Sequence, residues 1–323
     1  MRLPDSLRRL AALVLTTAAL FVGFFLGVRP WYLVWGATDA EQRRSLPGDE
    51  LVPDARDQAT STRAITIQAP PEKVWPWLAQ LGQDRGGFYS YEVLEDLVGT
   101  RMENADRVHP EFQAWKVGDK LWMYPPEKLD GQGHALLARI DPGRVLGFVT
   151  RQYGTPPTEP YNGSWSFILE PLGEGATRLL IRGRAGGTRA FLGSTFDHAL
   201  FEPMHFVMER KMMETLEQRA EGGRVSEVAD TAHPVLWTVT FALFIVSLVR
   251  VVRHERWLWA LAAFAAAGIV FQILTFAQPP LAVGGILVLG VVLLLWLPPM
   301  LSPRRAAPRA RVMPSRLTHE AGR

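Results

Sequence analysis

The 323-residue chain contains no cysteine. Disulfide frameworks, cysteine-ligated zinc sites and thiol nucleophiles are therefore excluded. The absence leaves the redox compartment open, because a domain without disulfides folds on either side of a membrane. The sequence also has no Ser-His-Asp order and no cofactor fingerprint, and we expect no cofactor. The glycine-rich segment 82–87 lacks the Gly-Lys-Ser/Thr ending of a phosphate-binding loop.

The chain also lacks an excess of acidic over basic residues. The chain has 35 Lys and Arg against 32 Asp and Glu, and its calculated pI is about 9.3. The basic excess lies mostly at the two ends, beside apolar segments. Nucleic-acid binding would need a basic patch on a folded face. Arginines that flank apolar segments favour membrane orientation instead, so we expect no nucleic-acid partner.

The first apolar segment carries no charge from Leu10 to Val28. Its length approaches what a helix needs to cross the hydrocarbon core. Trp31, Tyr32 and Trp35 follow it, as is typical of the membrane interface. A cleaved signal peptide is the alternative, but the run is long and bulky aromatics stand where small residues would precede cleavage. We therefore predict a retained anchor over residues 1–34.

Three further spans are predicted within residues 224–300. They cover about 233–250, 257–277 and 281–298, and the links between them are short. Short links favour antiparallel helical hairpins. The remaining segment, 301–323, is predicted to be a disordered basic tail. The chain is thus expected to have four transmembrane helices.

The distribution of arginine predicts the orientation of these spans. If the N-terminus is cytoplasmic, the basic start, the basic 250–256 link and the basic tail all lie in the cytoplasm. The uncharged 278–280 link then lies outside. This arrangement agrees with the positive-inside rule at every short segment. It predicts that both termini are cytoplasmic and that the segment 35–223 is an extracytoplasmic soluble domain.

The middle segment, 35–223, has the pattern of an α+β domain. Helices are predicted over 70–82, 89–98 and 203–222, with Pro76 as a kink in the first. Alternation and turn residues predict strands over 62–68, 117–124, 134–140, 144–151, 163–170 and 177–184. One strand, two helices, a run of antiparallel strands and one long C-terminal helix form a helix-grip order. In this arrangement a curved sheet wraps the last helix, and the space between them can enclose an apolar cavity.

Several segments of this domain resemble the SRPBCC superfamily. They are Trp35-Gly-Ala-Thr, Pro47-Gly-Asp-Glu-Leu, Thr62-Arg-Ala-Ile-Thr-Ile, Ala69-Pro-Pro-Glu with Val74-Trp-Pro-Trp-Leu, Arg85-Gly-Gly-Phe-Tyr-Ser-Tyr and Met208-Glu-Arg-Lys-Met. This START-like group includes polyketide cyclases, dehydrases and lipid-transfer proteins. The resemblance covers roughly residues 35–221 and implies a START/Bet v 1-like helix grip in a membrane-anchored bacterial protein. The fold hosts unrelated functions, so the resemblance does not identify the ligand. The membrane is accordingly predicted to be the bacterial inner membrane.

Aromatic, arginine and methionine side chains of the domain are candidates for the wall of a ligand cavity. The alternative for the aromatics is a filled core, and for the arginines a solvated sheet face. The candidates are Trp75, Phe88, Tyr89, Tyr91, Trp122, Tyr124, Arg151, Trp165, Arg182, Arg184, His205, Met208 and Met212.

A possible metal site near the last helix is not favoured. His198, Glu202, His205 and Glu209 follow one another at spacings of four, three and four. Pro203 belongs in the first turn of a helix, which leaves His198 and Glu202 before it. His205 and Glu209 remain as an i, i+4 pair, too few ligands for a metal.

Three hypotheses for function follow. The leading one is membrane-tethered binding of a lipid-like or other hydrophobic small molecule. The second is a cyclase or dehydratase acting on a polyketide-like substrate, with acid/base or oxyanion groups among Tyr89, Tyr91, Arg182, Arg184 and His205. The third is a structural or sensory membrane module without a ligand, whose core is filled by tryptophans 75, 77, 122 and 165. The lipid bilayer is the other expected partner.

Overall fold

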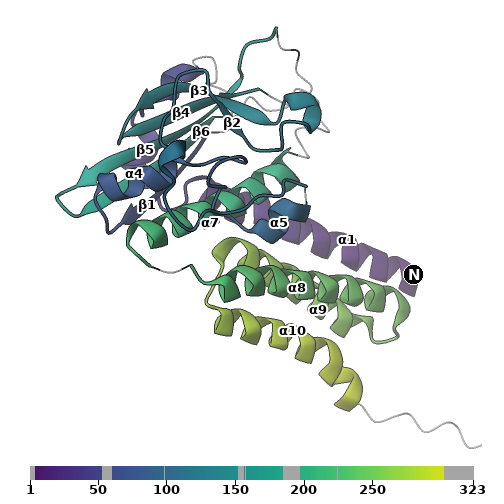
Figure 1. The fold of residues 1–323 in the computed structure, drawn as a ribbon. Coiled ribbons are helices and arrows are strands. Elements are labelled where there is room, and N and C mark those ends of the chain that lie inside the picture. Colours follow the sequence, from purple (N-terminus) through teal and green to yellow (C-terminus); the bar gives the residue numbers. More distant parts are fainter. Residues whose placement is uncertain are drawn as a thin grey trace, which may run out of the picture.

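The computed structural model describes residues 4–52, 60–97, 99–151, 156, 158–184, 197–223 and 225–301. Figure 1 shows two parts: a sheet with helices against one face, and a set of long helices beside it. The predicted basic tail lies outside the described residues, apart from the end of the last helix.

The six predicted strands are all present and form one antiparallel sheet. Its strand order is β1-β6-β5-β4-β3-β2, so the first and last strands of the sequence pair with each other. The strands are β1 (Thr60–Ile67), β2 (Lys120–Trp122), β3 (His134–Asp141), β4 (Val145–Thr150), β5 (Gly163–Leu172) and β6 (Ala176–Arg184).

Glycine-containing turns connect the central strands. Gly143 in the β3–β4 turn has φ 80°, and Gly173 in the β5–β6 turn has φ 68°. Residues with a side chain rarely adopt these left-handed values, which glycine tolerates. The two hairpins predicted from the turn residues are therefore confirmed.

The long helix α7 (Glu202–Ala220) packs on the inner face of the sheet, as Figure 1 shows. Phe148 and Phe167 of the sheet are fully buried in one cluster with Met212, Met213 and Leu216 of this helix. Helix α4 (Pro71–Ala79) contributes Val74 and Leu78 to the same cluster. A sheet wrapped around a long C-terminal helix confirms the predicted helix grip.

Two helices differ from the prediction at their ends. Helix α4 contains Pro76, as predicted, but ends at Ala79, before Gly82. Helix α5 (Glu92–Leu97) begins three residues later than expected. The reason is Tyr89, whose φ of 56° is left-handed and incompatible with a right-handed helix.

The outer face of the sheet is covered by the segment before β1. This lead-in segment, residues 36–52, includes α3 (Asp39–Arg43) and the 3₁₀ turn η2 (Asp49–Leu51). Its Leu46 is buried with Ala64, Ile168 and Leu180 of the sheet. The sheet is thus covered on both faces.

The apolar helices form the second part. The first is continuous through α1 (Asp5–Gly23), η1 (Phe24–Val28) and α2 (Arg29–Leu33). The others are α8 (Glu227–Arg253), α9 (Trp257–Gln272) with η7 (Ile273–Ala277), and α10 (Leu281–Leu301).

Among the described residues, three of these helices, not four, are long and apolar enough to cross a membrane. They are Asp5–Leu33, Val228–Arg253 and Trp257–Ala277. The predicted fourth span corresponds to α10, whose apolar stretch among the described residues, Leu281–Trp296, is shorter. The prediction of four spans is therefore corrected to three candidates and one shorter apolar helix, which packs against α8 and α9.

Arginines gather at the end of the helices that lies away from the sheet. Arg9 donates to the carbonyl oxygens of Val251 and Val252 at 3.3 and 3.1 Å. Arg250 donates to the carbonyl oxygen of Leu295 at 2.9 Å. The carbonyl groups of Val251 and Val252 belong to the last turn of α8 and lack partners within that helix. The carbonyl of Leu295 lacks a helical donor because residue 299, four positions later, is proline. The direction in which the helices cross a membrane stays a prediction.

Candidate functional site

A buried ion pair links the sheet to α7. Arg63 on β1 donates from Nη1 to Oε1 of Glu209 at 2.6 Å, and the two side chains are only 1% and 2% exposed. Arg63 also donates from Nε to the carbonyl oxygen of Tyr32 at 2.8 Å. Charges are stable in an apolar interior only when they are paired and hydrogen-bonded. The pair therefore connects β1, α7 and the end of the first apolar helix.

Glu209 is also held from the opposite side. The indole N–H of Trp165 on β5 donates to Oε2 of Glu209 at 2.8 Å. His205, one turn earlier on α7, places Nε2 3.9 Å from the same oxygen. The His205 ring lies 5.5 Å from that of Trp165 and 6.1 Å from that of Phe201. The result is a polar group with aromatic walls inside an otherwise apolar interface.

Desolvation by the protein atoms packed around the His205 ring lowers its pKa below the usual value, and the neighbouring Glu209 opposes this effect only in part. This direction favours the neutral imidazole. A neutral imidazole accepts a proton or a hydrogen bond through one ring nitrogen and donates through the other. Among His205, Glu209, Arg63 and Trp165, His205 is therefore the side chain best suited to accept or donate a proton.

The contact between α7 and the sheet changes along the helix. Met212, Met213 and Leu216, in its second half, are essentially inaccessible to solvent. In its first half Met204 is 40% exposed, and the side chain of His205 is 39% exposed. His205 is thus partly exposed in the first half of α7, although its neighbours Phe206 and Val207 are buried. We call this partly exposed start of α7 the open end of the grip, and the polar group lies there.

Several predicted cavity residues lie around this group or in the core below it. Phe88 packs against Trp165 with ring centroids 6.1 Å apart. Met212 and Tyr89 belong to the same buried cluster, and Trp75 packs against it. Met208 is half-buried, one turn from Met212 on α7. Their roles as ligand contacts stay predictions.

The hydroxyl of Tyr89 is engaged within the protein. It accepts a hydrogen bond from Nε2 of Gln80 at 2.7 Å and donates to the carbonyl oxygen of Trp77 at 3.3 Å. The backbone N–H of Tyr89 bonds Oδ1 of Asn104, which holds the left-handed residue in place. Burial raises the pKa of Tyr89, so the hydroxyl stays protonated. These contacts anchor the loop that precedes α5.

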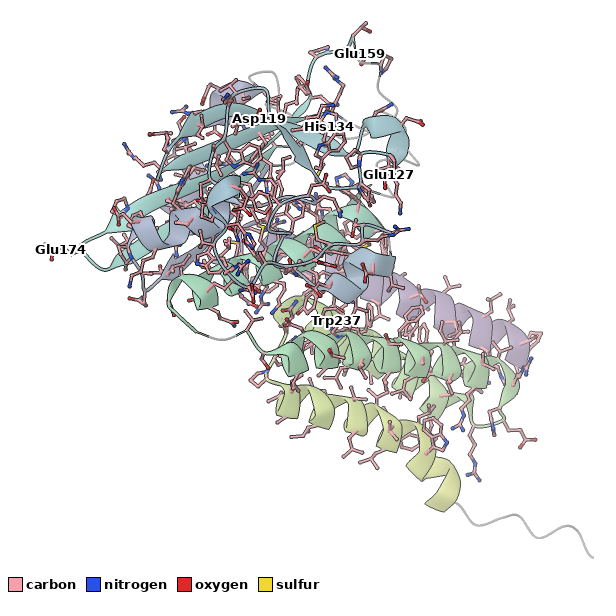
Figure 2. The ribbon with its side chains drawn as sticks, viewed as in Figure 1. Asp119, Glu127, His134, Glu159, Glu174 and Trp237 are labelled. Atoms are coloured by element: carbon pink, nitrogen blue, oxygen red, sulfur yellow. The ribbon has the colours of Figure 1, made fainter. Side chains whose placement is uncertain are left out.

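Tyr91 lies outside the grip, where the sheet part meets the apolar helices. Its hydroxyl is 3.3 Å from Nδ1 of His233 and 3.3 Å from Oε1 of Gln278. Its ring lies 5.2 Å from that of Trp237, which Figure 2 shows on the first half of α8 beneath the sheet part. Tyr91 thus connects the two parts of the chain.

Arg182 and Arg184 lie on the outer face of the sheet. Arg182 donates to the carbonyl oxygens of Glu41 and Arg44, both at 3.1 Å. Arg184 donates to the carbonyl oxygen of Asp49 at 3.1 Å. Both side chains hold the lead-in segment on the sheet and do not reach the interior of the grip.

The remaining candidates also lie away from the polar group. Trp122 packs against His134 at 4.9 Å, on the face of the sheet opposite the core cluster. Arg151 lies over the ring of Tyr161 at 4.1 Å. Tyr124 is half-buried beside Gly133.

The sequence analysis missed Arg63 as a site residue. The signal was present, because alternation along β1 places Arg63 on the same face as Ile65 and Ile67. Glu209 was considered only as one half of a pair with His205. The prediction that Pro203 leaves His198 and Glu202 before the helix is wrong. The helix α7 begins at Glu202, and the π-helical segment η6 (Asp197–Phe201) runs directly into it, because Phe201 keeps a helical backbone conformation. The described residues contain no group of three or more side chains that could hold a metal ion.

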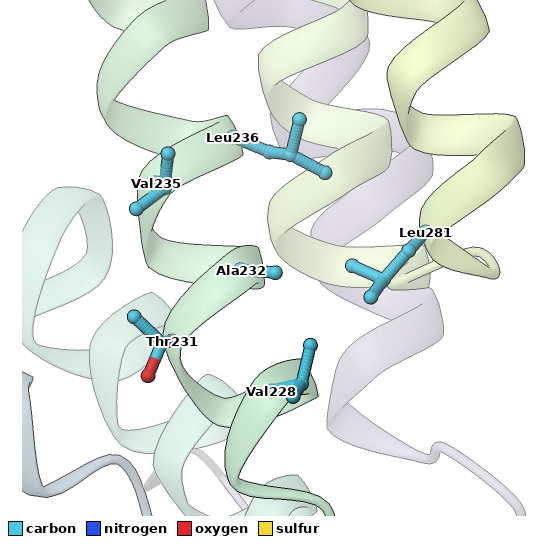
Figure 3. A pocket seen from close by; sticks show the side chains of 6 residues that line it. All are labelled: Val228, Thr231, Ala232, Val235, Leu236 and Leu281. Atoms are coloured by element: carbon cyan, nitrogen blue, oxygen red, sulfur yellow. The ribbon is translucent and has the colours of Figure 1, made fainter.

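An open apolar groove lies between the beginnings of α8 and α10, as Figure 3 shows. Its volume is about 650 Å³. Its lining residues are Val228, Thr231, Ala232, Val235, Leu236 and Leu281. None of the six is titratable, so this groove offers no acid/base chemistry.

The sheet and α7 form a helix grip. Comparisons with known proteins add little to this assignment, which rests on the strand order and on the position of α7. No family model matches the chain, and no curated protein matches it.

Solved structures match about half of the chain. The protein MLL2253 from Mesorhizobium loti is 18% identical, with 51% of this chain and 99% of that one covered and a TM-score of 0.29. The Polyketide_cyc-like protein Cgl2372 from Corynebacterium glutamicum is 19% identical, with 50% and 79% covered and a TM-score of 0.23. Protein Ms6760 from Mycobacterium smegmatis is 15% identical, with 51% and 90% covered and a TM-score of 0.27. Likenesses at this level carry no argument about the function of this chain.

Proposed function

We propose that the protein binds a lipid-like or other hydrophobic small molecule at the open end of the helix grip, while its apolar helices hold it in a membrane. The observation that carries the proposal is the change in burial along α7. It leaves His205 accessible between aromatic rings, directly beside the buried Glu209. A mostly apolar wall with a few fixed polar groups is the usual form of a small-molecule site.

The ion pair suits a positioning role in such a site. Glu209 receives hydrogen bonds from both Arg63 and Trp165, so its carboxylate is held before any ligand arrives. A group fixed in advance costs less conformational entropy on binding. His205, on the accessible side, is then the group that contacts the polar end of the ligand.

Binding is tested with the full-length protein in lipid nanodiscs. Organic extraction and mass spectrometry identify any co-purified molecule, and titration with a fluorescent fatty acid measures saturable uptake. We expect His205→Leu to weaken uptake, whereas His254→Leu, at an exposed position between α8 and α9, leaves it unchanged. Absence of both a co-purified molecule and saturable uptake would refute the proposal and favour a structural or sensory module.

A cyclase or dehydratase activity is the second candidate, favoured by the neutral His205 beside Glu209. A neutral imidazole at an open, aromatic-walled end is suited to act as a general base. On this proposal His205→Asn abolishes turnover of a polyketide-like substrate but retains its binding. Equal turnover by wild type and variant would exclude it. Of the four tryptophans that would fill the core of a module without a ligand, Trp165 lies in the core cluster and Trp75 and Trp77 pack against it, whereas Trp122 lies on the outer face.

For the location, we propose a bacterial inner membrane with the grip outside and both termini in the cytoplasm. The cysteine-free chain allows single cysteines to be placed at Leu172, on the β5–β6 hairpin, and at Glu255, between α8 and α9. An impermeant maleimide on intact cells is expected to label the first and to reach the second only after lysis. The reverse pattern would overturn the orientation.

A further inference from the structure

Large apolar side chains remain exposed around the place where the grip meets the apolar helices. We call them the rim. They are between 40% and 79% exposed. The rim consists of Trp31, Val93, Leu97, Leu200, Phe201 and Met204.

One side of the rim is continuous with the end of the first apolar helix. Glu202, next to Phe201, accepts hydrogen bonds from Arg29 at 2.9 Å and from the Tyr32 hydroxyl at 2.6 Å. Trp31 packs edge-on against Phe206 of α7, with ring centroids 5.8 Å apart. The exposed residues at the start of α7 therefore lie at the level where the first candidate span ends.

The other side of the rim belongs to α5. Leu94, between the two exposed residues of this helix, packs against the cluster formed by the apolar helices. Tyr91, directly before α5, packs against Trp237 of α8 with ring centroids 5.2 Å apart. Leu97 is 79% exposed, slightly more than Leu26 within the first candidate span, which is 77% exposed. A side chain of this kind next to the apolar helices is costly to leave in water.

We propose that the rim lies in the headgroup layer of the bilayer leaflet on the side of the grip. The partner is the lipid surface, because the rim is continuous with the ends of the helices that are expected to cross the membrane. Tryptophan favours this layer, and exposed leucine and phenylalanine anchor interfacial helices in it.

This placement also gives the proposed ligand a route. Phe201 of the rim stacks on His205, whose ring contacts Trp165 inside the grip. The open end of the grip therefore faces the leaflet, and a hydrophobic molecule passes from the bilayer to His205 without crossing water. This part of the inference rests on the proposed function.

The test uses single cysteines in the cysteine-free chain, labelled with the environment-sensitive fluorophore NBD, in phosphatidylcholine nanodiscs. Nanodiscs leave both membrane surfaces accessible to the quencher iodide. Leu97 and Phe201 report on the rim. Val117 and Leu172, 65% and 48% exposed, are matched apolar positions away from it. Phe21, 52% exposed on α1, is the reference for a buried position in the bilayer.

We expect iodide quenching constants at Leu97 and Phe201 to be at least about threefold below those at Val117 and Leu172, since interfacial residues sit several ångströms below the surface. Equal constants at all four positions, with Phe21 protected, would overturn the rim alone. Quenching at Phe21 as well would overturn the membrane placement and the rim together. A protected rim without lipid uptake would refute ligand binding and leave the rim confirmed.

Discussion

The pair formed by Arg63 and Glu209 is fully enclosed, so its removal has a predictable cost. Glu209→Leu leaves the guanidinium of Arg63 without a counter-charge in an apolar core, and Arg63→Met leaves the carboxylate in the same state. Removing one partner of a buried ion pair costs about 3–5 kcal/mol of stability. For a domain of this size each kcal/mol lowers Tm by about 2–4 °C, so each single variant should melt about 6–20 °C earlier.

The double variant separates the pair from its surroundings. Replacing both residues by apolar ones removes the two charges together, a change that often leaves the stability of a protein nearly unchanged. It still leaves the Trp165 N–H and the Tyr32 carbonyl without partners, at about 1–3 kcal/mol each. We therefore expect the double variant to cost less than the sum of the single variants by at least about 2 kcal/mol.

Thermal unfolding of the full chain in nanodiscs, followed by circular dichroism, measures these effects. Arg43→Met is the control, because Arg43 and Asp39 are 75% and 81% exposed and 3.7 Å apart. An exposed pair of this kind contributes at most about 1 kcal/mol. Single variants that melt together with the control, or a double variant that equals their sum, would refute the reasoning.

Three further predictions concern other buried contacts. Hydrogen bonding to Arg178 lowers the pKa of Glu41 from 4.5 to about 2, so the ionised pair stabilises the fold above about pH 5. Arg178→Met should therefore lower the free energy of unfolding, measured by urea titration, by its full amount above about pH 5. The difference from wild type should vanish as pH falls towards 2. Burial raises the pKa of Glu95 from 4.5 to about 7, so ionisation of this carboxyl lowers the stability of the fold as pH rises. Glu95→Gln should therefore stabilise the fold at pH 8 by about 3 kcal/mol. No gain in stability at pH 8 would contradict the raised pKa. A Cβ on Gly36, whose φ is 70°, would lie 2.1 Å from the carbonyl oxygen of Ala64, so Gly36→Ala should lower Tm by several degrees, whereas Gly175→Ala, with open space around it, should change Tm little.

Local patterns were enough to predict most of the fold. The strands follow from alternation and from turns with Gly143 and Gly173, and the position of α7 follows from Pro203, although η6 extends the helical stretch back to Asp197. The late start of α5 could not be predicted, because the left-handed conformation of Tyr89 depends on its contact with Asn104, fifteen residues later.

The candidate site was predicted less well, because its contacts join distant parts of the chain. Arg178 and Glu41 are 137 residues apart, and nothing local indicates that the lead-in segment crosses the outer face of the sheet. Arg182 and Arg184, which the sequence analysis assigned to a cavity wall or a solvated sheet face, instead hold this segment on the sheet. Arg63, by contrast, could have been predicted from its position on the same face of β1 as Ile65 and Ile67.

The pairing of β1 with β6 has a consequence for the order in which the chain folds during synthesis. β1 emerges early but pairs with no strand other than β6 among those described, and Arg63 meets Glu209 only 146 residues later. Contacts of such separation close slowly. β1 therefore has no strand partner until β6 has been made, and Arg63 has no counter-charge until α7 has been made, shortly before α8. A ribosome stalled after β6 would hold a chain in which Arg63 still lacks its counter-charge, so completion of the grip and synthesis of the second apolar helix are consecutive events.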